Sequence, residues 1–190
     1  MCASCLGHAL PDARQFDLCV TDPPYGVSYV GKTKDELTLE NDDLDATETG
    51  RFWSQVVDRL EFWLRDGAVI YATVPPGPLH VLFASRLEQN RWLRQILVWA
   101  KDSMVLGHSD YHYQHEPILY GWKPGAPHRA VKDRTQTSVF NIARPKASRD
   151  HPTTKPLELW VRFIQNSSIA SEQVLDPFLG SGTTLIACAR

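Results

Sequence analysis

The sequence has 190 residues, of which 43% are hydrophobic and 22% are charged, and this composition excludes an intrinsically disordered chain. A formal net charge of −2 excludes a uniformly basic protein, and no apolar run is long enough to cross a bilayer. The first ten residues lack the regions of a secretory signal, so we expect a single cytoplasmic domain over residues 1–190.

Apolar and amphipathic stretches alternate along the chain, which predicts an α/β domain. Short apolar runs predict strands at residues 17–21, 68–73, 95–99, 117–120 and 174–175. Three- and four-residue apolar spacings predict helices at residues 51–64, 79–92 and 156–169, the last capped by Thr153 or Thr154, and a further helix from Thr183. Residues 101–115 are interpreted as a loop and residues 123–150 as an irregular, proline-interrupted segment.

Charged residues are unevenly distributed. Between Lys34 and Asp66 there are ten acidic and four basic residues, whereas between Lys123 and Lys155 there are eight basic and two acidic ones. A local basic stretch on a near-neutral chain is typical of a segment that follows nucleic-acid phosphates, and equally of a solvated loop. Charge by itself leaves both interpretations open.

Cysteine and histidine spacing predicts no metal site. Cys2 and Cys5 form a C-x-x-C pair, but no second pair completes the four ligands of structural zinc, so reduced thiols are expected. His108, His112 and His115 have a spacing that does not establish coordination geometry, and we interpret them as residues that support a loop.

The first motif with chemical potential is Asp22-Pro23-Pro24-Tyr25, directly after the first predicted strand. The prolines fix the backbone and donate no N–H, so their carbonyls are available as acceptors, and Asp22 adds a carboxylate. An amine with two N–H bonds is able to donate one to Asp22 and one to the Pro23 carbonyl, which localises its lone pair for attack on an electrophilic methyl group. The Tyr25 ring is suited to stack on a planar base. A tight turn is the alternative interpretation.

The second motif is the glycine-rich sequence DPFLGSGTT at residues 176–184, between a strand and a helix. Gly180 and Gly182 allow a tight turn and the close approach of a ligand, and N–H groups at a helix start suit a polar or anionic moiety. A dinucleotide fingerprint needs glycine or alanine at Leu185, and a Walker A loop needs lysine at Thr183, so neither fits.

In this order the two motifs resemble the DNA amino-methyltransferases in which the catalytic motif precedes the cofactor motif, with likeness to a phage and prophage branch. The sequence HPTTKP at residues 151–156 resembles the family element that helps to bind the methionine end of the cofactor. Residues 97–101 and 115–121 resemble later strands of the family. The resemblance runs from about Asp17 to Arg190 and implies a Rossmann-like methyltransferase fold with a mostly parallel, seven-stranded sheet.

The resemblance also implies roles for individual residues. The catalytic residues would be Asp22, Pro23, Pro24 and Tyr25. The cofactor would be S-adenosylmethionine, bound by Thr154, Lys155, Asp176, Phe178, Gly180, Ser181, Gly182 and Thr183. The partner would be double-stranded DNA, with residues 122–150 as the candidate target-recognition region and contacts from Lys32, Lys34, Arg129, Lys132, Arg134, Arg144 and Lys146.

Aspartate at the first tetrad position implies site-specific methylation of adenine N6 after base flipping, because serine is usual in the family for cytosine N4. Cytosine N4, RNA or a protein glutamine amide remain alternative methyl acceptors. The family continues past the glycine-rich turn with strands that include a ribose-binding acid, so we expect the last strands of the cofactor half to be missing and the isolated chain to have weak or no activity. An inactive remnant that binds DNA or a partner is the alternative from a different class.

Overall fold

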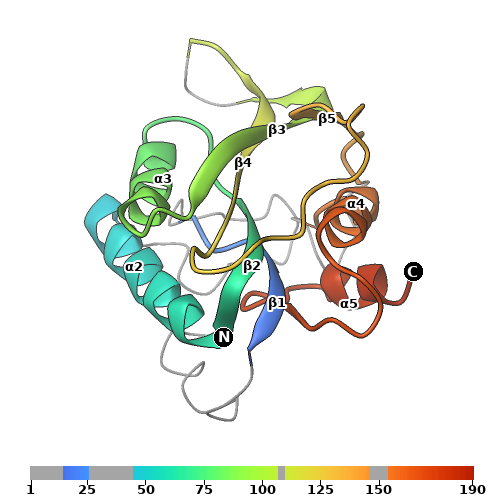
Figure 1. The fold of residues 1–190 in the computed structure, drawn as a ribbon. Helices are drawn as coiled ribbons and strands as arrows, with labels where there is room; N and C mark the ends of the chain where they lie inside the picture. Colours follow the sequence, from blue (N-terminus) through green and yellow to red (C-terminus); the bar gives the residue numbers. More distant parts are fainter. Residues whose placement is uncertain (1–14, 26–44, 107–109, 146–153) are drawn as a thin grey trace.

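A computed structural model describes residues 15–25, 45–106, 110–145 and 154–190. These residues form one six-stranded sheet with α2 and α3 on one face and α4 and α5 on the other (Figure 1). None of the helices in these ranges is both long and apolar enough to cross a membrane. In chain order, the elements are β1 Phe16–Thr21, α2 Ala46–Trp63, β2 Leu64–Thr73, α3 Leu79–Gln89, β3 Leu93–Val105, β4 Tyr113–Trp122, β5 Val139–Asn141, α4 Leu157–Ser167, β6 Val174–Leu175 and α5 Thr183–Cys188.

The strand order is β5-β3-β4-β2-β1-β6, and three of the five pairings are parallel. Strand β4 runs antiparallel to both β2 and β3. Since β1, β2 and β6 run in the same direction, their carboxyl ends lie at one edge of the sheet, and the amino end of β4 lies there too. Ligands of open α/β sheets bind outside this edge, so the topology of the sheet predicts the active site there.

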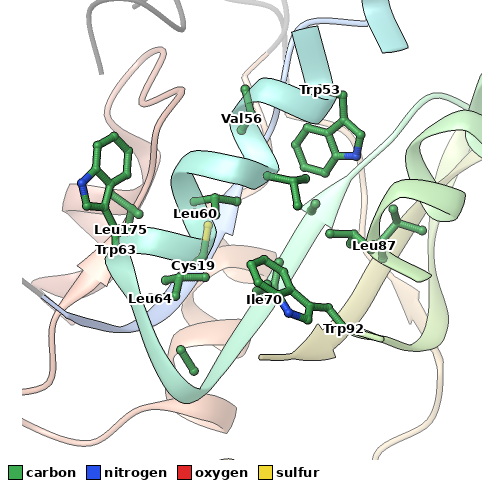
Figure 2. Packing of buried hydrophobic residues seen from close by; sticks show 14 of the residues in the cluster. Cys19, Trp53, Val56, Leu60, Trp63, Leu64, Ile70, Leu87, Trp92 and Leu175 are labelled. Atoms are coloured by element: carbon green, nitrogen blue, oxygen red, sulfur yellow. The ribbon is translucent and has the colours of Figure 1, made fainter. Parts of the chain in front are cut away.

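Alternate residues of the central strands enter two separate cores. On β1, Leu18 and Val20 face α4, whereas Cys19 packs with α2 and α3. Figure 2 shows the core on the α2 and α3 face, where Trp53 and Trp92 are buried in the same cluster as Cys19. The sheet is thus covered on both faces, and its carboxyl edge is the part left for chemistry.

Several helix and strand boundaries differ from those predicted. Helix α2 begins at Ala46 rather than at residue 51, because Asp45 and Glu48 form a reciprocal capping box at its start. The N-cap of α4 is Pro156, without a side-chain hydrogen bond, so the prediction of a threonine cap is wrong. Thr154 lies two residues before this cap, and Thr153 lies outside the described residues.

The prediction of a loop over residues 101–115 is also wrong. Strand β3 continues to Val105 and β4 begins at Tyr113, with a register shift in their ladder between Ala100 and Val105. Strands pair through their backbones and need no apolar side chains. A solvent-facing pair of strands is therefore not detected by a search for apolar runs. The three residues of β5 pair in parallel with β3 inside the segment expected to be irregular, and three residues are too few to show a period.

Among the described glycines, Gly121 leaves the least room for a side chain. A Cβ built on Gly121 would lie 1.8 Å from the carbonyl oxygen of Trp92, which also accepts a hydrogen bond from the Trp122 N–H. We therefore expect Gly121→Ala to lower the free energy of unfolding by about 3 kcal/mol, because backbone rather than a flexible side chain must move. Urea denaturation measures this change.

The matched control for that substitution is Gly50→Ala in α2. Its Cβ would meet only the flexible Leu82 side chain, at 3.0 Å, and alanine favours a helix by about 1 kcal/mol over glycine. Equal stabilities for the Gly121 and Gly50 variants would contradict the close backbone approach.

Candidate active site

The tetrad at residues 22–25 lies at the carboxyl edge of the sheet, where β1 ends. Oδ1 of Asp22 accepts hydrogen bonds from the Tyr25 hydroxyl at 2.8 Å and from the Thr73 hydroxyl at 2.5 Å. Thr73 is the last residue of β2, the strand beside β1, and this pairing brings the two side chains together. The Asp22 carboxylate is therefore held in one orientation by neighbours from its own turn and from the adjacent strand.

A buried charged network continues from Asp22 and consists of Asp22, Lys155, Glu116 and Lys101. The Lys155 Nζ lies 3.0 Å from Asp22 Oδ1 and 2.9 Å from Glu116 Oε2. The other oxygen of Glu116, Oε1, lies 2.6 Å from the Lys101 Nζ. Acidic and basic groups alternate, so the two positive and two negative charges balance.

Burial makes this balance necessary. The side chains of Lys155, Glu116 and Lys101 are 10%, 14% and 7% exposed. Burial opposes the charge on Lys155, but attraction to Asp22 and its other neighbours raises the pKa of Lys155 well above the usual range. Burial likewise opposes the charge on Glu116, yet Lys155 and Lys101 lower its pKa overall. Both groups are consequently charged at neutral pH.

Tyr25 is held by contacts at its hydroxyl group, and the stacking of its ring on a base stays a prediction. Its hydroxyl donates to Asp22 and receives a 3.3 Å contact from the Lys155 ammonium. Burial, followed by repulsion from Asp22, raises the pKa of Tyr25 well above the usual range, so the hydroxyl keeps its proton and remains a donor. The ring meets Phe83 of α3 edge to face, with centroids 6.4 Å apart.

The glycine-rich turn lies at the same edge, after β6. Gly180 and Gly182 have φ values of 51° and 82°, in the left-handed region that glycine adopts without strain. A Cβ on Gly182 would meet nothing within 4 Å, so the turn presents open backbone. The cavity beside it has a volume of about 310 Å³ and is lined by Pro145, Thr154, Lys155, Leu157, Ser181, Thr183 and Ile186.

Lys155 connects the two motifs. Its side chain lines this cavity together with Ser181 and Thr183, while its ammonium contacts Asp22. The cavity combines hydroxyl and ammonium donors with aliphatic walls, which suits a ligand that has both charged and apolar parts. The residues present therefore fit an amino-acid-containing cofactor next to the Asp22 carboxylate.

Two residues of the turn have partners inside the protein. Asp176 Oδ2 accepts a hydrogen bond from the Thr184 hydroxyl, and Oδ1 accepts one from the Phe178 N–H at 3.0 Å. The Phe178 ring packs against Phe52 of α2, with centroids 5.7 Å apart. Phe178, although predicted to bind the cofactor, thus contributes its ring to the core on the α2 face.

The family of the chain can now be stated from its match to known proteins. A family model described as DNA methylase, for N6 and N4 enzymes, matches residues 16–190. The chain belongs to the N6/N4 DNA methylases. Among related enzymes, the type II methyltransferase M2.MboI of Moraxella bovis is 27% identical over 204 residues, covering 92% of this methylase and 72% of that enzyme.

Solved structures confirm the Rossmann-like methyltransferase fold predicted for this DNA methylase. TTHA0409 from Thermus thermophilus matches with a TM-score of 0.65 and 26% identity over 99% of this chain and 81% of that one. The same Thermus protein has been solved complexed with S-adenosyl-L-methionine. The cytosine-N4-specific PvuII DNA methyltransferase matches with a TM-score of 0.76 over 96% of this chain and 74% of that one, but at 14% identity it shows the fold alone.

Within the part of the chain that the structure describes, the basic residues predicted to contact DNA are not gathered in one place. The Arg129 guanidinium bonds Glu172 at 2.5 Å and 3.0 Å, just before β6, at the opposite end of the strands from Asp22. The Arg144 backbone N–H donates a hydrogen bond to Asp102, and burial together with the Arg144 charge lowers the pKa of Lys101 in the charged network. Arg144 therefore lies near the active site. Lys132 and Arg134 are exposed, and Lys32, Lys34 and Lys146 lie outside the described residues.

Sequence reasoning missed three residues of the site. Thr73 contacts the tetrad directly, Glu116 reaches it through Lys155, and Lys101 is bound to Glu116. A weak signal existed for Glu116, because an acid directly before the apolar run at residues 117–120 is unusual for a buried strand. Thr73 carried no signal, since a threonine at a strand end is ordinary.

The Asp176 carboxyl predicts a pH dependence of stability. Burial raises its pKa from 3.8 to about 6, against the opposing effect of its hydrogen bonds. The folded protein thus binds this proton more tightly than the unfolded one, so the contribution of Asp176 to the free energy of unfolding falls as the pH rises from about 4 to about 6. The loss is on the order of 2–3 kcal/mol.

Asp176→Asn removes this titration. Urea denaturation between pH 4 and pH 7 should show the wild-type protein losing stability relative to the variant as the pH rises. A constant offset between the two curves would contradict the raised pKa, because the altered hydrogen bonds of asparagine do not depend on pH.

Proposed function

We propose that this DNA methylase transfers a methyl group from S-adenosylmethionine to the exocyclic N6 of adenine in double-stranded DNA. The observation that carries the proposal is the Asp22 carboxylate, which is fixed by Thr73, Tyr25 and Lys155, and of these Lys155 also lines the cavity beside the glycine-rich turn. The preference for adenine follows from aspartate at the first tetrad position.

In this proposal Asp22 orients the substrate amine. The three contacts described above all end on Oδ1, so Oδ2 accepts one amine N–H, and the Pro23 carbonyl accepts the other. Use of both hydrogens turns the nitrogen lone pair away from the ring and toward the cavity. Asp22 acts as an acceptor rather than as a general base, because the amine is nearly non-basic and loses its proton readily once methylated.

Thr154, Lys155, Ser181 and Thr183 would hold the cofactor, together with the backbone at Gly180 and Gly182. When bound, S-adenosylmethionine supplies an electrophilic methyl group on a sulfonium centre. The hydroxyl groups of Ser181 and Thr183 suit the polar groups of the methionine part, and the side chains of Leu157 and Ile186 supply an apolar wall of the cavity.

The substrate adenine must leave the duplex to reach Asp22, because its amine is inaccessible inside the base stack, and flipping costs a few kcal/mol. Arg144, beside the charged network, is the described basic residue best placed to contact a phosphate next to the flipped base. We further propose residues 122–150 as the target-recognition region. The predicted cytoplasmic location is the compartment in which bacterial DNA is exposed to such an enzyme.

Nucleoside mass spectrometry tests this function. Unmethylated DNA is incubated with the protein and S-adenosylmethionine, digested, and measured for both methylated nucleosides. We expect N6-methyladenine. N4-methylcytosine would overturn the adenine assignment while keeping the reaction type. Absence of both products, with no heat in a calorimetric titration of S-adenosylmethionine, would instead favour an inactive DNA-binding or partner-binding protein.

A further inference from the structure

We infer that Glu116 is a positioning residue: it holds the Lys155 ammonium against Asp22 Oδ1, so that Asp22 Oδ2, which has no partner among the described residues, stays open to an incoming amine. The kinetic part of this inference rests on the proposed function. The geometric part concerns side chains that the structure describes and stands without it.

The three N–H bonds of Lys155 match three acceptors. They are Asp22 Oδ1 at 3.0 Å, Glu116 Oε2 at 2.9 Å and the Tyr25 hydroxyl at 3.3 Å. An ammonium has three donors, so this arrangement uses its full capacity. Lys155 contacts one oxygen of Asp22 and has no donor left for the second.

Removal of the Glu116 charge would weaken the hold on one of these donors, because a neutral amide oxygen attracts an ammonium less than a carboxylate does. The nearest strong acceptor is then Asp22, whose Oδ2 a flexible lysine stem is able to reach by a small rotation. Such a two-point contact would occupy the oxygen to which the substrate amine must donate. Glu116 therefore protects the acceptor that Asp22 offers.

The backbone of Glu116 suits an anchoring role. Glu116 lies in β4, paired with Trp99 of β3, with Pro117 and Ile118 buried next to it. Lys155, by contrast, precedes α4 in a segment without regular structure. A carboxylate on a central strand is a fixed reference point, whereas a lysine with four rotatable bonds is not.

Lys101 completes the arrangement by holding the other oxygen of Glu116 at 2.6 Å. Each oxygen of the Glu116 carboxylate thus binds a different lysine, so neither Lys101 nor Lys155 binds both oxygens. Lys101 also supplies the charge that keeps the buried network neutral. Glu116 and Lys101 are thus expected to differ in effect, because only Glu116 touches Lys155.

The test compares Glu116→Gln with the double variant Glu116→Gln/Lys101→Met, in which the charges balance again. Glu158→Gln is the matched control, since Glu158 is exposed on α4 and paired with Arg162 at 3.5 Å. We expect Glu116→Gln to lower kcat for methyl transfer by about 10- to 100-fold, with KM for S-adenosylmethionine changed less than about threefold. The double variant should be more thermally stable than Glu116→Gln, but its kcat should stay as low.

A second readout does not require activity. In protein with 15N-labelled lysine, the Lys155 ammonium should give an NMR signal protected from exchange with water in the wild type and in Glu158→Gln, and lose that protection in Glu116→Gln. Recovery of kcat together with stability in the double variant, or an unchanged ammonium signal in Glu116→Gln, would overturn the inference. A wild-type protein that methylates no DNA would contradict the proposed function instead, and the NMR signal would still test Glu116.

Discussion

Asp22→Ala is expected to lower kcat for methyl transfer about 100- to 1,000-fold, the range found when one fixed hydrogen-bonding group of an active site is removed. The physical reason is that the substrate amine loses the acceptor that turns its lone pair toward the cavity. Affinity for S-adenosylmethionine should change less than about threefold, because the cavity is lined by other residues. Steady-state transfer of labelled methyl to DNA and calorimetric titration of the cofactor measure the two effects.

Asp22→Asn and Asp58→Ala serve as comparisons for that result. Asparagine keeps an oxygen acceptor and a similar volume, so it should retain more activity than alanine. Asp58 is exposed on α2 and paired with Arg86, away from the site, and its variant should transfer methyl groups at the wild-type rate. Equal rates for Asp22→Ala and Asp58→Ala would refute the assigned role of the carboxylate.

Lys155→Met is expected to have the largest effect on stability, lowering the free energy of unfolding by about 3–5 kcal/mol. Lys155 is the cation between Asp22 and Glu116, and all three side chains are at least three-quarters buried. Its removal leaves two carboxylates facing each other with only Lys101 to compensate. Urea denaturation at neutral pH measures the loss.

Addition of Glu116→Gln to Lys155→Met should restore part of that stability, because the two carboxylates no longer repel each other and the network again has zero net charge. Lys132→Met, an exposed substitution of the same type, should change stability by less than about 0.5 kcal/mol. If Lys155→Met proved no more harmful than Lys132→Met, the buried network would not be the ionised arrangement described above.

The charged network also explains how one site carries several acids. Asp22, Glu116 and Asp176 all lie near the carboxyl edge of the sheet, and Asp22 contributes to the raised pKa of Asp176. Lys155 compensates the first two, whereas Asp176 relies on hydrogen bonds from Thr184 and the backbone. The pKa of Glu116 is lowered whereas that of Asp176 is raised, which favours separate roles for these two acids.

Local sequence patterns determined much of this protein. Alternating apolar runs identified the α/β class, and most of the strands and helices were predicted near their observed positions. The tetrad at residues 22–25 and the turn at residues 176–184 stood out because prolines and glycines restrict or free the backbone in ways visible over a few residues. Such signals span only a few residues, so they can be recognised in the sequence without knowledge of the fold.

Only the tertiary structure decided what surrounds Asp22. Thr73 and Lys155 contact Asp22, and Glu116 contacts Lys155, although all three are distant from Asp22 in sequence. They come together because β2 pairs with β1, β4 returns antiparallel beside β2, and the segment before α4 crosses the same edge. Strand order and direction depend on how the two cores pack as a whole, and no local pattern encodes them. The acceptor motif was therefore recognisable in the sequence, whereas the buried charges that hold it emerged only from long-range pairing.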